Sequence, residues 1–222
     1  LLQRVSPDDL SEAAFPYLTS RDIEIGYSRI RALRVTYVGE LGFELLIPSD
    51  QAVSVWQTLE SAGGDLGLRP VGLAAMHGLR LEKAYRDFGV DIDVTDTPVS
   101  AGLAFAVAWD KPVDFRGKAA LADVRTDRSS RLVPLRVDDP TPLLHGSEPV
   151  FKDGVRVGHL QVGGFGHTLG RSVGLATLDN VEGVTAEWLA SGGFEVVVNG
   201  HTFPATVQFA PFYDPERARV RG

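Results

Sequence analysis

The sequence predicts an α+β domain followed by a small all-β barrel. Up to about Val124, helix and strand patterns are mixed, whereas from Arg131 onward short β-rich runs recur between turn sequences. The chain's 222 residues are enough for one large domain or two small ones. We place the boundary in the charged, serine-containing stretch 126–130, which predicts one domain over residues 1–126 and another over residues 127–222.

The first domain contains a predicted β-hairpin. Residues 31–37 alternate in polarity, residues 39–42 contain two glycines and form a turn, and residues 43–47 form the returning strand. On that strand the pleat places Glu44 on one face together with Leu46, while the other three side chains point the opposite way.

Glu44 is the first candidate site residue, because a carboxylate within an apolar run needs a partner if it is buried. It pairs either with one of the nearby arginines or with a ligand that presents two adjacent N–H donors. A pterin ring is such a ligand, since its 2-amino group and N3–H lie side by side. Tyr37, seven residues earlier, could offer an aromatic face to the same flat ring.

A helix is expected after the hairpin. Ser49 or Asp50 is a suitable N-cap, and Gly63-Gly64 is a suitable stop. Its apolar residues recur at helical spacing at Val53, Trp56 and Leu59.

A second helix is expected from Pro70 to about Lys83, with apolar residues almost all the way round, and we therefore predict that it is largely buried. Arg80 lies inside it between two leucines. A guanidinium in that position needs a carboxylate, a carbonyl or an anionic ligand, so a structural ion pair and a binding role are both open. The aspartates that follow, at 87, 91 and 93, are most typical of turns.

The second domain is predicted from five β-rich runs, a pattern typical of a small barrel or sandwich. They are residues 132–137, 155–163, 172–178, 194–198 and 202–209. Asn199-Gly200 is a strong two-residue hairpin signal. The glycine-rich run 163–170 lacks the spacing of a nucleotide-binding loop and predicts a hairpin or barrel-corner loop instead.

Composition excludes several classes of function. The net charge of −7 argues against a nucleic-acid partner, and no apolar run is long enough to predict a membrane span. Cysteine is absent, and the five histidines show no paired ligand spacing, so no metal is expected. Without a signal-like segment, cytoplasmic localisation is the default expectation.

Taken together, the motifs resemble the glycine-cleavage T-protein (aminomethyltransferase) family. The resemblance is carried, in chain order, by Tyr37-Val-Gly-Glu-Leu-Gly-Phe-Glu44, Gly78-Leu-Arg-Leu-Glu-Lys83, Phe88-Gly-Val-Asp-Ile92, Thr97-Pro-Val-Ser-Ala-Gly-Leu103, Phe115-Arg-Gly-Lys118 and Gly163–Gly170. Within the family, Glu82-Lys-Ala-Tyr-Arg86 and the segment 211–220 are most similar to the C-terminal folate half of dimethylglycine and sarcosine dehydrogenases or oxidases.

The resemblance implies tetrahydrofolate as the ligand of this chain and a small methylated amine as the substrate. A flavin domain in the same polypeptide would oxidise the amine, with FAD bound only in that N-terminal half outside this chain. The folate half would then capture the one-carbon unit as 5,10-methylenetetrahydrofolate. The folate-side domain is expected to be incomplete at its N-terminus, because the family builds it partly from upstream residues.

Three site residues follow from the resemblance. Glu44 matches the glutamate that grips the pterin, Tyr37 matches an aromatic of the folate site, and Arg80 matches an arginine of the folate pocket. The family's catalytic aspartate belongs to a segment before Leu1, so the chain is expected to hold no catalytic residue. The alternatives are a free-standing aminomethyltransferase, a related folate-dependent demethylase, and a non-catalytic folate-binding or scaffolding fragment.

Overall fold

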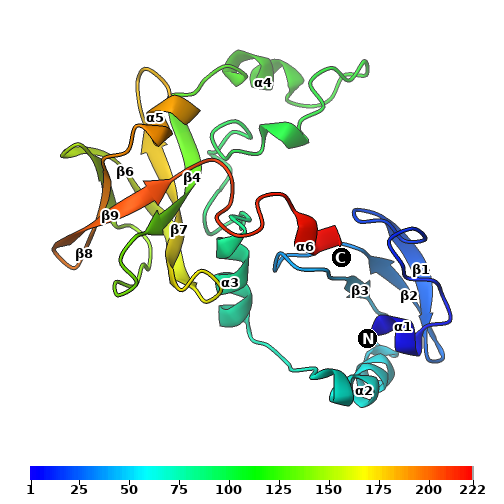
Figure 1. Cartoon of the computed structure of the whole chain (residues 1–222). Helices are drawn as coiled ribbons and strands as arrows, with labels where there is room; N and C mark the ends of the chain where they lie inside the picture. Colours follow the sequence, from blue (N-terminus) through cyan, green and yellow to red (C-terminus); the bar gives the residue numbers. More distant parts are fainter. Residues whose placement is uncertain (222) are drawn as a thin grey trace. The chain divides into compact units, whose positions relative to one another are not determined.

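The computed structural model describes residues 1–221 and confirms the predicted fold class, an α+β part followed by a β-barrel (Figure 1). The chain forms two compact units. The first comprises Leu1–Met76 together with the end of the chain from Glu216, and the second comprises His77–Pro215. In the described residues, no helix has both the length and the apolarity needed to cross a membrane.

The first unit is built on a three-stranded antiparallel sheet in the order β1-β2-β3. Its elements are α1 (Leu2–Val5), β1 (Ser20–Ile25), β2 (Ser28–Leu33), β3 (Glu44–Leu46), α2 (Ala52–Gly63), the 3₁₀ turn η1 (Gly64–Leu66) and α6 (Ala218–Arg221). Successive side chains of β1 and β2 point to opposite faces of the sheet, and one of these faces is buried. Ile23 and Ile30 lie on the buried face and are opposite each other in the β1–β2 register.

Helix α2 covers the buried face of this sheet through Val55, which is 1% exposed, and Leu59. These residues are four apart and therefore lie on one side of the helix. The predicted helix is confirmed, but of the three apolar residues at helical spacing only Leu59 packs against the core, since Val53 and Trp56 are 67% and 54% exposed. The predicted stop at Gly63 is confirmed, but Gln51 is the N-cap residue and no side chain caps the helix.

Helix α3 spans Leu73–Glu82, so it begins three residues later than predicted and ends where expected. Its burial is also uneven. Leu73 is 78% exposed, whereas the last turn, from Arg80 to Glu82, is buried. The largely buried helix predicted from its all-round apolar pattern is therefore correct only for the C-terminal end.

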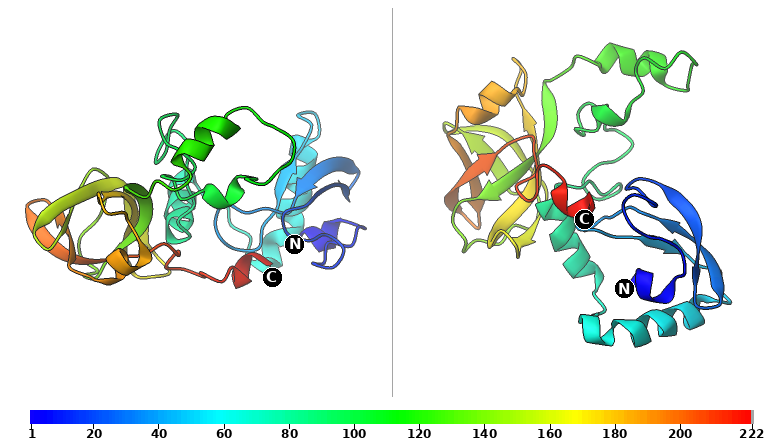
Figure 2. Two further views of the ribbon diagram at one scale, coloured as in Figure 1. Left: turned by 90° about the horizontal axis from the view of Figure 1, so that it is seen from above. Right: turned by 45° about the vertical axis from the view of Figure 1, so that its right-hand side comes forward.

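The second unit contains a closed six-stranded barrel in the order β4-β7-β6-β5-β8-β9, which the left view of Figure 2 shows around its axis. The strands are β4 (Ser130–Val137), β5 (Pro149–Lys152), β6 (Val155–Gly166), β7 (Arg171–Asp179), β8 (Phe194–Val198) and β9 (His201–Val207). Three short helices accompany it: η2 (Ala104–Ala106), α4 (Lys118–Val124) and α5 (Ala186–Ala190). Among the barrel strands, β5 is the one that the sequence did not predict.

Because the barrel is closed, its sheet has no free edge. The six strands surround a core of buried, mostly aliphatic side chains. Its fully buried members include Val133, Leu135, Leu160, Leu178 and Val196. Burial of each such side chain stabilises the fold by about 1.5–3 kcal/mol. The barrel thus has a core of its own.

Two predicted turns are confirmed. Asn199 and Gly200 have φ values of 51° and 80°, the left-handed conformation that a two-residue hairpin turn requires. The glycine-rich run forms the end of β6 and the turn into β7. Gly163 permits a close approach there, since a Cβ atom at this position would lie 2.4 Å from the Cβ of Leu144.

Candidate functional site

Glu44 is the first residue of β3 and lies on the exposed face of the sheet. Leu46 shares that face and is 59% exposed, while Phe43, Leu45 and Ile47 pack against the core of the unit. The arrangement of faces predicted from the pleat is confirmed. The carboxylate is exposed and therefore does not carry the desolvation cost that burial would impose.

The side chain of Glu44 has no hydrogen-bond or ion-pair partner among residues 1–221. Two arginines of the same unit are engaged elsewhere. Arg31 pairs with Asp22, and the buried Arg34 pairs with Glu12 at 2.7 Å and donates to the carbonyl of Phe15. Pairing with a nearby arginine, the first alternative for Glu44, is therefore absent. The carboxylate is available to accept hydrogen bonds from a ligand.

Tyr37 lies half-buried in the connection between β2 and β3, seven residues before Glu44 and in the same unit. This connection is shaped by two glycines. Gly39 has a φ of 80°, and a Cβ atom at Gly42 would come within 3.2 Å of the carbonyl oxygen of Val35. The turn thus depends on the glycines that the sequence motif contains.

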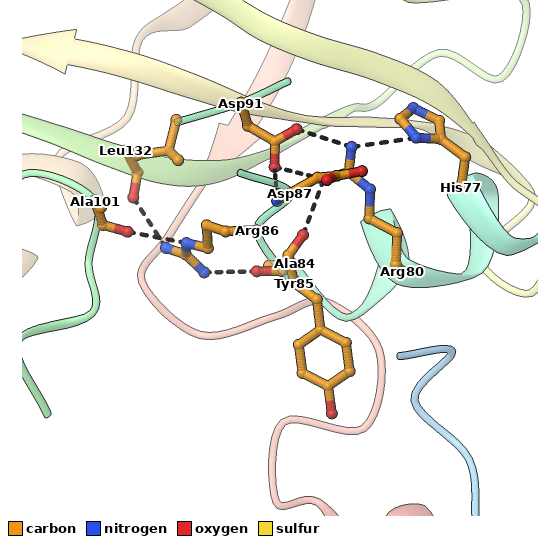
Figure 3. A network of polar contacts seen from close by, with 9 residues as sticks. All are labelled: His77, Arg80, Ala84, Tyr85, Arg86, Asp87, Asp91, Ala101 and Leu132. Carbon is orange, nitrogen blue, oxygen red and sulfur yellow. Dashed lines mark hydrogen bonds and ion pairs between the residues drawn. The ribbon is translucent and has the colours of Figure 1, made fainter. Parts of the chain in front are cut away.

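Arg80 belongs to the second unit, and its side chain is fully buried. Its guanidinium makes a two-pronged ion pair with Asp91, with distances of 2.5 Å to Oδ2 and 2.8 Å to Oδ1 (Figure 3). It also donates to the carbonyl oxygen of Tyr85 at 2.9 Å and lies 3.2 Å from Nδ1 of His77. The ion pair considered from the sequence is present in the structure.

Asp91 fixes the segment after α3. Besides Arg80, its Oδ2 accepts a hydrogen bond from the backbone N–H of Asp87 at 2.9 Å (Figure 3). Sequence reasoning treated Asp91 only as a turn former, and no local pattern identified its partner. The signal available in the sequence was Gly89, a glycine in this loop that adopts a φ of 93°.

His77 completes this network at the other side of Arg80. Partial burial and the Arg80 charge lower the pKa of His77 below its usual value of 6.5. Since a guanidinium has only donors, Nδ1 of His77 accepts and the ring proton lies on Nε2. The imidazole is therefore neutral at pH 7.

Arg86 holds together three separate backbone segments. Its guanidinium donates to the carbonyl oxygens of Ala84 at 2.6 Å, Ala101 at 2.9 Å and Leu132 at 3.2 Å (Figure 3). Burial lowers the pKa of Arg86, whereas the Asp91 charge acts in the opposite direction. The side chain joins the loop after α3 to the first strand of the barrel.

Two further charged residues at the end of α3 anchor other segments of the second unit. Oε1 of Glu82 accepts the backbone N–H groups of Thr168 and Leu169, both at 2.8 Å. Lys83 forms a buried ion pair with Asp214 at 2.8 Å. The motif Gly78–Lys83 thus supplies the polar contacts that hold the β6–β7 turn and the C-terminal segment.

The described residues contain no group of three or more histidine, cysteine, aspartate or glutamate side chains that could hold a metal ion. Of the three predicted site residues, Glu44 and Tyr37 lie in the same unit. Arg80 lies in the other unit within its own network.

Comparison with known proteins gives the class of protein. The family model for the GCVT N-terminal domain matches residues 1–111, half of the chain, and that for the glycine cleavage T-protein C-terminal barrel domain matches residues 130–214. The chain belongs to the glycine cleavage T-protein family.

Particular relatives that match the whole chain are named as an oxidase and a dehydrogenase. The chain is 44% identical over 223 residues to "4-methylaminobutanoate oxidase (formaldehyde-forming)" of Paenarthrobacter nicotinovorans, covering 100% of this chain and 26% of that protein. It is 33% identical over 225 residues to human mitochondrial sarcosine dehydrogenase, covering 100% of this chain and 24% of that protein. The chain therefore spans about a quarter of the length of these relatives.

A solved structure supports the same assignment. The glycine cleavage system aminomethyltransferase T from Bartonella henselae matches with a TM-score of 0.71 and 27% identity, over 84% of this chain and 50% of that one. An aminomethyltransferase of Alkaliphilus metalliredigens is 37% identical over 180 residues, which covers 81% of this chain and 48% of that protein.

Proposed function

We propose that this chain is the tetrahydrofolate-binding C-terminal part of an N-methyl-amine dehydrogenase or oxidase. Family membership supports folate chemistry, and the names of the relatives that match the full length of the chain support a methylated amine as substrate. A flavin domain in the same polypeptide would bind FAD and oxidise the amine. The one-carbon unit released would pass to this part.

The observation that carries the proposal is the unpaired, exposed carboxylate of Glu44 among residues 1–221. A carboxylate has two acceptor oxygens, and the 2-amino group and N3–H of a pterin are two adjacent donors that match them. Tyr37, which the connecting turn positions in the same unit, would offer its ring to the pterin. These two residues would bind and orient the folate.

For Arg80 we propose a positioning role in the folate pocket. Its guanidinium is engaged by Asp91, Tyr85 and His77, so it acts on the pocket by holding the segment 85–91 in place. Arg80 would therefore influence folate affinity through that segment.

Tetrahydrofolate would supply the nitrogen nucleophiles that accept the one-carbon unit, and the product would be 5,10-methylenetetrahydrofolate. The protein's contribution would be proximity and the exclusion of water, so that a reactive iminium or formaldehyde meets folate before it is hydrolysed or lost. The residue that handles the proton would come from the upstream segment of the family fold.

The experiment is a calorimetric titration of 5-formyltetrahydrofolate into the chain, the Glu44→Gln variant and a Glu24→Gln control. Glu24 is an exposed carboxylate of β1 on the same face of the sheet as Glu44. Its substitution by Gln changes the net charge by the same amount as Glu44→Gln. We expect Glu44→Gln to weaken binding by about 1–3 kcal/mol, the cost of a lost charge-assisted pair. Glu24→Gln should bind normally. Equal affinities in all three proteins would remove Glu44 from the pterin site.

A second candidate function is a free-standing aminomethyltransferase. It is favoured by the match to the Alkaliphilus enzyme, of which the chain covers 48%, against about a quarter of the oxidases. The sequence before Leu1 discriminates: a flavin-binding domain there supports the first candidate, and a short folate-fold segment alone supports the second. If the chain binds no folate when joined to either kind of upstream segment, its role would be that of a scaffold.

A further inference from the structure

A small cavity in the second unit has features of an anion site, and neither Glu44 nor Tyr37 lines it. It has a volume of about 160 Å³ and opens between the loop after α3, strand β4 and the segment after β9. It is lined by Arg86, Gly102, Ala104, Phe105, Arg131, Leu132 and Phe209. Two guanidinium groups therefore border one small space.

Gly102 gives Arg86 its place at this cavity. A Cβ atom at Gly102 would lie 2.6 Å from the Nη2 atom of Arg86, and its φ of 71° already disfavours other residues. The absence of a side chain leaves room for the guanidinium, which the three carbonyls described above hold in one orientation. One wall of the cavity is thus a fixed cationic group.

Arg131 provides the second cation, and its charge is poorly compensated. Its Nη1 donates to the carbonyl of Val99, but its buried Nε–H has no hydrogen-bond partner. Within residues 1–221, no carboxylate lies within ion-pair distance of Arg131. Burial and the Arg128 charge lower the pKa of the Arg131 guanidinium, and the Asp127 charge acts in the opposite direction.

Apolar side chains line part of the cavity beside the two cations. The centre of the Arg131 guanidinium lies 5.8 Å from the ring centroid of Phe209, and Leu132 also lines the cavity. A hydrogen bond between a guanidinium and a carboxylate is charge-assisted and roughly twice as strong as one between neutral groups. Planar guanidinium groups suit planar carboxylates, which they bind through two parallel hydrogen bonds.

We infer that this cavity binds a small organic carboxylate through Arg131 and Arg86. Its volume is below the roughly 300–1,000 Å³ of sites for drug-sized ligands, so the ligand is of the size of acetate or benzoate and smaller than a folate. Phe209 gives the pocket an aromatic surface for a flat ligand. The inference stands on the second unit alone and does not depend on the proposed folate function.

The test is an NMR titration in which sodium benzoate is added to the whole chain labelled with ¹⁵N. A parallel titration with sodium chloride at the same ionic strength is the control. The arginine Nε–H signals report on the guanidinium groups directly. We expect a saturable shift of the Arg131 signal and of the backbone signals of Gly102 and Leu132 with benzoate but not with chloride. Binding should weaken about tenfold or more in Arg131→Gln, as expected for one lost charge-assisted contact.

Arg128→Gln is the matched control, since Arg128 is exposed, lies near Arg131 and lines no part of the cavity. It should bind benzoate as the parent chain does. Equal weakening in both variants, or shifts that never saturate in the parent chain, would overturn the inference. If Arg131→Gln does not fold, Arg131→Lys replaces it, and the titration of the parent chain still decides between a site and none.

Discussion

The substitution Asp91→Asn should strongly destabilise the second unit. Both side chains of the Arg80–Asp91 pair are 0% exposed, and Asp91 accepts two hydrogen bonds from Arg80 and one from the N–H of Asp87. Asparagine has a single acceptor oxygen, and its NH₂ group would face the donors of the guanidinium. The buried charge of Arg80 would then lack its counter-ion. Loss of one partner of a buried pair costs about 3–5 kcal/mol.

The assay is urea unfolding followed by tryptophan fluorescence in a Trp56→Phe background. Of the three tryptophans, Trp109 and Trp188 then remain, and both lie in the second unit. The control is Asp138→Asn, which breaks the partly exposed Arg136–Asp138 pair of the same unit, whose side chains are 31% and 44% exposed. An exposed pair contributes about 0–1 kcal/mol, so the control should change stability little.

The reasoning would be refuted if Asp91→Asn lowered the free energy of unfolding by no more than the Asp138→Asn control. That result would mean that solvent or a rearranged side chain compensates Arg80. The segment 85–91 would then have to be held by other contacts, and the positioning role proposed for Arg80 would lose its basis.

Two further predictions concern the surroundings of α3. Because the pKa of His77 is lowered, the unfolded chain binds more protons than the folded one below about pH 6.5. Stability should therefore fall as the pH drops from 7.5 to 5.5, and His77→Gln should reduce this dependence in urea unfolding; an unchanged pH profile would contradict the depressed pKa. Glu82→Ala leaves the N–H groups of Thr168 and Leu169 without their acceptor, which should cost about 1–3 kcal/mol for each group that stays buried. Hydrogen exchange at these two amides should accelerate relative to the rest of the barrel, and unchanged protection would show that Glu82 does not hold the turn.

Local periodicity was sufficient to predict much of the fold. The face of Glu44 followed from the two-residue repeat of a strand, and the Asn199-Gly200 turn followed from its need for two left-handed residues. Strand β5 was missed because its four residues are too few to show an alternating pattern. Periodicity could not give the orientation of α2, since Trp56 and Val55 lie on different sides and only packing determines which is covered.

The candidate site was predictable in part. The carboxylate of Glu44 in an apolar strand was visible in the sequence. Whether a nearby arginine pairs with it depends on the other partners that each arginine has in the folded chain. Arg34 is held by Glu12 and backbone carbonyls from a segment about 20 residues earlier, which no helix or strand repeat encodes. Asp91 and Arg80 meet for the same reason, across a loop whose path is set by tertiary packing.

The most direct test of the proposed one-carbon capture uses a polypeptide that joins this chain to the amine-oxidising flavin domain proposed above. Oxidation of an N-methyl amine such as sarcosine or dimethylglycine would be run with and without tetrahydrofolate, and free formaldehyde and 5,10-methylenetetrahydrofolate would both be measured. We predict that tetrahydrofolate lowers free formaldehyde and yields the methylene product. Glu44→Gln should shift the products back toward formaldehyde without slowing amine oxidation. Formaldehyde release that is the same with and without tetrahydrofolate would contradict the account.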